Sequence, residues 1–545
     1  MRRLFPVLVI GSALLYTALL FVSVRTENET NDEPAHIIAG YSYWVKRDFR
    51  LNPEHPPLSK LLCTIPLLFL KPAFPDDTSA WAEADEFKLG KELLYSVPDG
   101  GHRILLACRS VTILFTGAFA VFLAFWTRKN VSTKAALVVF FLFLVDPNIA
   151  AHGRYVTTDI FVTAFFFFTP ACWYTWLRTR QDKHLWLTGV VLGLALASKF
   201  SAVLLFPILA VIWAVIWAAI WMLRRERRER IPLARTLAAL ILIPAAMLFL
   251  LYAGDTRSIA KDPLIANRFD AESKTSSAWQ RVPVPGYYWF RGLQLVARHQ
   301  LGGHATPAYL LGTLSTKGFV AYFPVAFLVK TPTGTLLLLA AGLLFLRRSG
   351  ASLDLLLALG IPVGMYMFVA IFSSIDIGIR HILLIYPFLY VLLAAVLESV
   401  PLPRATQLAM SLALLVNLGE FAWVYPHPLA FFNTLAGGPK AGPRYLLDSN
   451  LDWGQGLIHL RDELASKPHT CLALEYFGRA DTNYYFPDNR AVPGNAEEAK
   501  RQPCLIAISV QRLYGDPAQP FSYLRAYQPI ARPGYAMYLY DPSHF

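Results

Sequence analysis

Long apolar runs recur along most of the sequence, and they constrain its fold more than any other feature. A helix needs about 20 predominantly apolar residues to cross a bilayer. Eleven runs approach or reach that length, and they cover approximately residues 4–22, 104–126, 134–150, 160–177, 185–198, 201–223, 234–252, 319–346, 352–372, 380–398 and 405–424. The sequence therefore predicts a mainly α-helical, polytopic membrane protein of about 11 transmembrane helices.

Two of these spans, at 185–223 and at the N-terminus, could be interpreted in more than one way. The apolar stretch 185–223 is too long for one helix and carries Lys199 in its middle, so we expect a hairpin with Lys199 at its tip. The first run follows Met1-Arg2-Arg3, as in a signal peptide, but no small-residue cleavage site comes after it. We therefore expect an uncleaved first span.

Basic residues indicate the orientation of the spans. With the N-terminus inside, the predicted cytoplasmic loops contain all the basic clusters that adjoin a span, namely Arg128-Lys129, Lys134, Arg178, Arg180, Lys183, the arginines of 224–230, Arg347-Arg348 and Arg404. This distribution is what the positive-inside rule predicts. We expect a multi-pass protein of the plasma (inner) membrane with a cytoplasmic N-terminus.

The composition agrees with a membrane protein. Of the 545 residues, 55% are hydrophobic and 16% are charged, whereas soluble proteins have about 25% charged residues. The net charge of +13 could suggest a nucleic-acid partner, but the basic residues lie in short clusters between apolar runs. We therefore predict no binding of nucleic acid.

Three long segments fall on the extracytoplasmic side of this topology: the loops 24–103 and 253–318, and the tail 425–545. The tail has strand-like apolar runs beginning at Cys471 and Cys504, and a helical pattern near 454–465. It predicts a small extracytoplasmic α+β domain after a transmembrane domain at 1–424. Cys471 and Cys504 could form a disulfide in that compartment.

Candidate catalytic residues begin directly after the first span. Asp32 and Glu33 stand at the lip of that helix, with His36, Glu54 and His55 further along the loop. Carboxylates near lipid suit a general base that activates a hydroxyl, because burial tunes their pKa. The alternative is that the two acids cap a helix start.

Further charged groups reach the same side of the membrane. Asp159 opens an apolar helix, which is costly without a partner, although a helix cap is again the alternative. Lys199 could either snorkel to the interface or bind a phosphate. The other outside candidates are Arg154, His304, Lys330, Arg380 and His381. Converging cations beside carboxylates suit a lipid-linked phosphate donor, with Lys199, Lys330, Arg380 and His381 as its ligands.

The tail contains the polar run 448–455, Asp-Ser-Asn-Leu-Asp-Trp-Gly-Gln, which includes Asp452. It could bind sugar or form a turn that leads into a helix. The sequence has no Walker loop and no Gly-rich dinucleotide fingerprint. Because ATP and nucleotide sugars are absent outside the cell, a transferase there needs a donor that crosses the membrane, such as a polyprenyl phosphate.

In order and sidedness, several motifs resemble those of the multi-pass GT-C glycosyltransferases. They are Asp32-Glu33, Glu54-His55-Pro56-Pro57-Leu58, Asp159, Gly378-Ile379-Arg380-His381, Asn433–Pro439 and Asp448–Gln455. The resemblance is to protein O-mannosyltransferases, lipid A aminoarabinose transferases and phospholipid carrier-dependent glycosyltransferases.

The resemblance implies a GT-C fold and an inverting transfer of one sugar from a dolichyl- or undecaprenyl-type phosphate. Asp32 would be the general base with Glu33 beside it, and Asp159 a second acid of the cavity. Lys199 and Arg380 would stabilise the leaving phosphate. A divalent metal could bind Glu54, His55 or His36, although these ligand types specify neither metal nor geometry.

The acceptor stays open among protein, lipid and glycan hydroxyls. One rival class is a flippase or other transporter of lipid-linked glycans, which would need charges through the bilayer midplane and often has inverted repeats. Another is a polymerase or ligase of whole glycans, which shares a cationic donor site. In this sequence the acids cluster at one face and no internal repeat is evident, which disfavours the transporter. A polymerase or ligase need not place an Asp-Glu pair after the first span.

Overall fold

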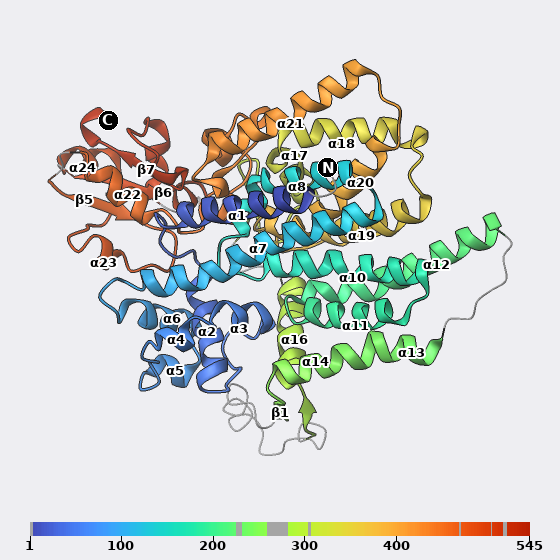
Figure 1. Ribbon diagram of the computed structural model, residues 1–545. Coiled ribbons are helices and arrows are strands. Elements are labelled where there is room, and N and C mark those ends of the chain that lie inside the picture. Colours follow the sequence, from blue (N-terminus) through green and yellow to red (C-terminus); the bar gives the residue numbers. More distant parts are fainter. Residues whose placement is uncertain are drawn as a thin grey trace.

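The protein is mainly α-helical, and every predicted apolar run contains a helix (Figure 1). The computed structural model describes residues 4–224, 232–258, 282–302, 307–467, 470–502, 504–515 and 520–545. The helices of the bundle are α1 Leu4–Val24, α7 His102–Asn130, α8 Thr133–Leu144, α10 Asp159–Thr179, α11 Asp182–Leu196, α12 Leu205–Arg224, α13 Leu233–Leu237, α14 Ile243–Leu251, α17 Tyr322–Lys330, α18 Thr333–Phe345, α19 Leu353–Ile371, α20 Tyr386–Glu398 and α21 Arg404–Val424.

Among the described residues, seven helices are long and apolar enough to cross a bilayer, or eight if one bent pair counts as a span. Several other helices of the bundle are shorter. For example, α8 has 12 residues and ends where Asp146 caps the next short helix, α9 Pro147–His152. The multi-pass character is therefore confirmed, and the number eleven stays a prediction.

The run predicted as one span at 319–346 is instead two helices, α17 and α18, which meet at 110°. Thr331 between them has extended backbone and is followed by Pro332. Proline has no N–H and disfavours helical conformation in the residue before it. The N–H of Thr333 at the new helix start donates to Glu420 Oε2 at 2.8 Å.

The predicted break at Lys199 is confirmed. Helix α11 ends at Leu196, and a short 3₁₀ turn, η1 Phe200–Leu204, leads into α12. Lys199 itself has extended backbone. The Lys199 side chain therefore extends from the short segment that connects α11 to α12.

The first loop folds into helices α2 Glu33–Val45, α3 Leu58–Cys63, α4 Leu67–Leu70, α5 Ser79–Glu83 and α6 Glu86–Tyr95. Helices α2 and α3 approach closely at Gly40, where an added Cβ would lie 2.3 Å from the Lys60 carbonyl oxygen. The second loop contains the paired strands β1 Thr256–Arg257 and β2 Val284–Pro285, helix α16 Tyr287–Gly302, and the hairpin of β3 Ala308–Leu310 and β4 Thr313–Ser315.

The tail forms the predicted α+β unit. Its sheet has the order β5-β6-β7, with β5 Leu472–Glu475 and β6 Leu505–Ser509 parallel, and β7 Met537–Tyr540 antiparallel to β6. A disulfide joins Cys471 and Cys504, directly before the two parallel strands. The helices are α22 Leu457–Leu464, α23 Thr482–Tyr485, α24 Ala496–Arg501 and α25 Val510–Tyr514.

This unit and helices α2–α6 lie at the same end of the bundle, on the left in Figure 1. They contact each other: Lys91 Nζ lies 3.2 Å from Asp481 Oδ2, and the Arg479 guanidinium lies 4.3 Å from the centre of the Phe87 ring. The first loop and the tail therefore form one cap on the bundle. A domain boundary at 424/425 stays a prediction.

Candidate functional site

A cavity of about 730 Å³ lies where the first loop meets the bundle. Its polar lining includes Asp32, His36, Asn52, Glu54, His55, Lys199, Ser201, His299, Gln300, Ser373, Arg380 and His381. Its apolar lining includes Phe200, Leu204, Leu293, Val296, Phe323, Tyr366, Phe368, Val369 and Phe372. Because Phe368 and Phe372 are 65% and 67% exposed, the apolar wall continues onto the outer surface of the bundle, where lipid would contact it.

Arg380 lies at the centre of the polar wall, in the turn η6 Ile379–Ile385 that precedes α20. Its Nη1 donates to Asp32 Oδ2 at 3.0 Å and lies 3.8 Å from Asp159 Oδ2. One guanidinium thus links two carboxylates that are far apart in the sequence.

Lys199 completes this group of charges. Its Nζ donates to Asp159 Oδ1 at 2.6 Å, while Asp159 Oδ2 has no hydrogen-bond partner in the described part of the chain. Asp159 is almost fully buried at the start of α10. The sequence-predicted residues Asp32, Asp159, Lys199 and Arg380 are therefore brought together as two cations and two anions. Asp32, Lys199 and Arg380 line the cavity, whereas Asp159 is buried beside the two cations and is not part of the lining.

The structure bears on the capping alternative for Asp32. The residue occupies the N-cap position of α2, yet its side chain makes no capping hydrogen bond. The carboxylate points to Arg380 instead and keeps 21% of its side-chain surface exposed. An exposed carboxylate oxygen at a cavity wall is available to a substrate hydroxyl. A carboxylate oxygen that accepts hydrogen bonds from backbone N–H groups at a helix start is not available in this way.

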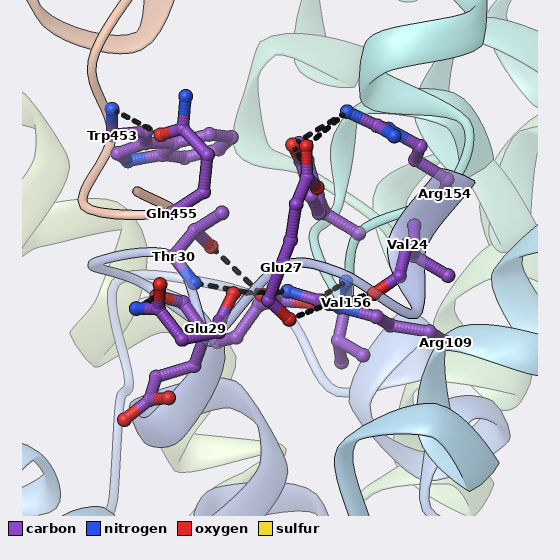
Figure 2. Close-up of polar contacts among 12 residues, drawn as sticks. Val24, Glu27, Glu29, Thr30, Arg109, Arg154, Val156, Trp453 and Gln455 are labelled. Carbon is purple, nitrogen blue, oxygen red and sulfur yellow. Dashed lines mark hydrogen bonds and ion pairs between the residues drawn. The ribbon is translucent and has the colours of Figure 1, made fainter. Parts of the chain in front are cut away.

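Glu33, the next residue, faces away from the cavity into a closed cluster. Its carboxylate accepts from Arg109 Nε at 2.8 Å and Nη2 at 2.6 Å, from Val156 N at 3.0 Å, and from the N–H and hydroxyl of Thr30. Figure 2 labels three of these partners, Thr30, Arg109 and Val156. Both Glu33 and Arg109 are fully buried, so this pair supports the first loop on α7.

The histidines His36 and His55 lie side by side in the cavity lining, with ring centres 5.0 Å apart. Burial lowers the pKa of His36 to about 3 and lowers that of His55 well below its usual value. Both imidazoles are therefore neutral at physiological pH.

Lys60 holds the loop that carries Glu54 and His55. Its buried Nζ donates to the carbonyl oxygens of Asn52 and His55, each at 2.7 Å. Burial lowers the pKa of Lys60 to about 7. Lys60 was not predicted as a site residue, because nothing in its local sequence distinguishes it from a surface lysine.

The metal candidates Glu54, His55 and His36 do not form a three-ligand set. Their ligand atoms do not converge within 4.8 Å, although all three residues are described. Glu54 Oε1 instead accepts from Asn52 Nδ2 at 3.0 Å. We therefore assign no chemical role to a metal bound by these three residues.

Other predicted site residues lie elsewhere. Buried Lys330 donates to the carbonyl oxygens of Leu429 and Asn450 and is absent from the cavity lining. Arg154 pairs with Glu27 at 2.9 Å. Asp452 is buried, with a pKa that burial raises to about 7, and His304 lies outside the described residues.

The polar run 448–455 braces the site from the tail. Ser449 Oγ accepts from Arg380 Nε at 3.1 Å and donates to Ile377 O at 2.6 Å. Asn450 Oδ1 accepts from Ile379 N at 2.9 Å, and the Trp453 ring lies 4.3 Å from the Arg380 guanidinium.

The same run also makes hydrogen bonds with the segment that precedes Asp32. Trp453 O accepts from Asn31 N at 2.8 Å, and Asn28 Nδ2 donates to Gly454 O at 2.7 Å. The run therefore fixes Arg380 and Asp32 relative to each other. The predicted turn that leads into a helix is confirmed, because α22 Leu457–Leu464 follows the run. The contacts of the run with Arg380 and with the segment before Asp32 were not predicted.

The sequence of residues 99–256 matches the model of the family described as dolichyl-phosphate-mannose-protein mannosyltransferase. This stretch carries Asp159 and Lys199, so the resemblance to that family is confirmed there. A comparison with curated proteins finds no match.

Several solved structures are similar to this chain. ArnT from Cupriavidus metallidurans bound to undecaprenyl phosphate has a TM-score of 0.47 and 13% identity, over 98% of this chain and 97% of that one. AglB from Archaeoglobus fulgidus, in complex with an inhibitory peptide and a dolichol-phosphate, has a TM-score of 0.44 and 11% identity, over 97% and 73%. The Saccharomyces cerevisiae Pmt1-Pmt2 complex bound to the sugar donor has a TM-score of 0.33 and 16% identity, over 48% and 34%.

Proposed function

We propose that this protein is a membrane glycosyltransferase that moves a sugar from a polyprenyl phosphate to an acceptor hydroxyl on the outer face of the membrane. The observation that carries the proposal is the cavity, where Lys199 and Arg380 stand beside Asp32 and Asp159 and an apolar wall opens toward lipid. The family match over 99–256 supports a donor of the dolichyl-phosphate kind.

The donor would lie with its isoprenoid chain along Phe368 and Phe372 and its phosphate at Arg380 and Lys199. Arg380 Nη2 makes no hydrogen bond among the described residues, and Lys199 uses one. These groups can therefore donate to phosphate oxygens while the carboxylates stay in place.

Asp32 would take the proton from the acceptor hydroxyl as its oxygen attacks the anomeric carbon. The bond from that carbon to the phosphate oxygen breaks, and the polyprenyl phosphate leaves with the electron pair, stabilised by Arg380 and Lys199. A single displacement inverts the anomeric configuration. Asp159 orients both cations and so sets where the phosphate lies.

The test is transfer of labelled sugar from defined polyprenyl-phosphate donors by the full chain in proteoliposomes. Wild type should give a glycosylated product, and the variant with Asp32→Asn, Asp159→Asn and Arg380→Gln should give none. Asp77→Asn changes an exposed acid of the first loop and is the matched control. Intact transfer by the triple variant would contradict the proposal, and donor movement across the bilayer without transfer would indicate a transporter.

A further inference from the structure

A cluster of metal-ligating side chains lies outside the cavity, at the junction of the bundle and the tail. Its members are Glu27, after α1; His427, after α21; and His459, on α22. Their ligand atoms all lie within 4.8 Å of one another. None of the three lines the cavity.

The two imidazoles are poorly satisfied by protein groups. His427 Nδ1 and His459 Nε2 are buried and have no hydrogen-bond partner among the residues that the structure describes. His459 Nε2 lies 3.9 Å from Glu27 Oε1, and the two rings meet edge to face with their centres 4.5 Å apart. A buried polar atom without a partner is costly, so a shared ligand between these nitrogens and the carboxylate would satisfy them.

The Glu27 carboxylate is also held in place by two protein donors. Arg154 Nη2 donates to Oε1 and the Tyr155 hydroxyl donates to Oε2, each at 2.9 Å, and Figure 2 shows the Glu27 carboxylate directed at Arg154. Hydrogen bonds of this kind orient the carboxylate ligands of metals.

We propose that Glu27, His427 and His459 bind a divalent transition metal, with zinc preferred and water as a fourth ligand. Two imidazoles and one carboxylate are a ligand set that zinc accepts, and they do not suit magnesium or calcium, which need more oxygens. The positive charge of Arg154 beside Glu27 weakens the site, so we expect lower affinity than in a four-ligand structural site. The metal would tie the end of α1 and the segment after α21 to the tail domain.

The test is metal analysis of the full chain in detergent or nanodiscs, after incubation with zinc chloride and removal of free metal. We expect about one zinc per chain, and a fall to background in the variant with His427→Ala and His459→Ala. His544→Ala, which changes an exposed histidine near the C-terminus, should keep the zinc. Cobalt in place of zinc should give visible absorption bands in wild type and in His544→Ala, but not in the double variant.

Two results would overturn the proposal: wild type that binds no zinc or cobalt above background, or zinc that persists at full occupancy in the double variant. Thermal unfolding of the wild type keeps the test independent of how well the variants fold. Zinc should raise its Tm and a chelator should lower it, because a ligand of the native state stabilises that state. An unchanged Tm together with absent metal would indicate that the cluster is an ion-pair network of Glu27 with Arg154 and His459.

Discussion

Two arginine–carboxylate clusters lie at the junction of bundle and cap, and they differ in how completely their polar atoms are used. In the first, Glu33 and Arg109 are fully buried, and the carboxylate accepts five hydrogen bonds. In the second, Arg380 binds Asp32, whose side chain is 21% exposed at a cavity.

The difference indicates separate roles for adjacent residues. A carboxylate with every oxygen occupied has no capacity for a substrate, and breaking its buried pair leaves an uncompensated charge. A partly exposed carboxylate with one strong partner can exchange that partner for a substrate group. We therefore assign stability to the Glu33 cluster and chemistry to the Asp32 cluster.

Asp32→Asn is the substitution with the largest expected effect. It removes the base but keeps the size of the side chain, so transfer should fall by about 10³-fold, within the range of general base catalysis, while Tm stays near wild type. The measurement is single-turnover transfer in proteoliposomes, with Asp77→Asn as the control. Full activity of Asp32→Asn would remove the assignment of Asp32 as the base.

Glu33→Gln tests the other side of the comparison. It leaves the Arg109 guanidinium buried without its counter-charge, and we expect a loss of about 3 kcal/mol of stability. Thermal unfolding in nanodiscs measures this loss, and Glu83→Gln, at an exposed position of α5, is the control. The fraction that stays folded should retain transfer. A stable but inactive Glu33→Gln would instead place Glu33 in the chemistry.

Asn450→Ala weakens the brace that fixes Arg380. The variant loses the acceptor for Ile379 N and the donor to the Tyr322 hydroxyl, at about 1 kcal/mol for each hydrogen bond. We expect transfer to fall by about tenfold, measured as initial rates at saturating donor. Asn483→Ala, at an exposed position of the tail domain, should be silent. Equal rates for both variants would show that the brace does not position Arg380.

His36→Gln has the smallest expected effect, which concerns the pH profile of transfer. The pKa of His36 is lowered to about 3, so the imidazole is neutral throughout pH 5–8 and takes up no proton there. The shape of the profile over that range should therefore match wild type. Loss of an inflection between pH 5 and 8 would identify His36, rather than a carboxylate, as a titrating group of the reaction.

Local patterns were sufficient to predict much of this molecule. Apolar length located each helical run, because a bilayer requires about 20 apolar residues. The break between two helices at Lys199 and the strands that follow Cys471 and Cys504 were also predicted. The bend at Pro332 was missed, since the apolar run continues on both sides of it.

Local sequence patterns predict a helical membrane protein in which Asp32 and Glu33 follow the first span. Which of these two acids faces the cavity depends on the packing of the whole chain. Successive residues of a helix point about 100° apart, and the two acids pair with arginines 348 and 76 positions away, Arg380 and Arg109. Partners at such separations meet through packing of helices from the whole chain, which no local pattern encodes.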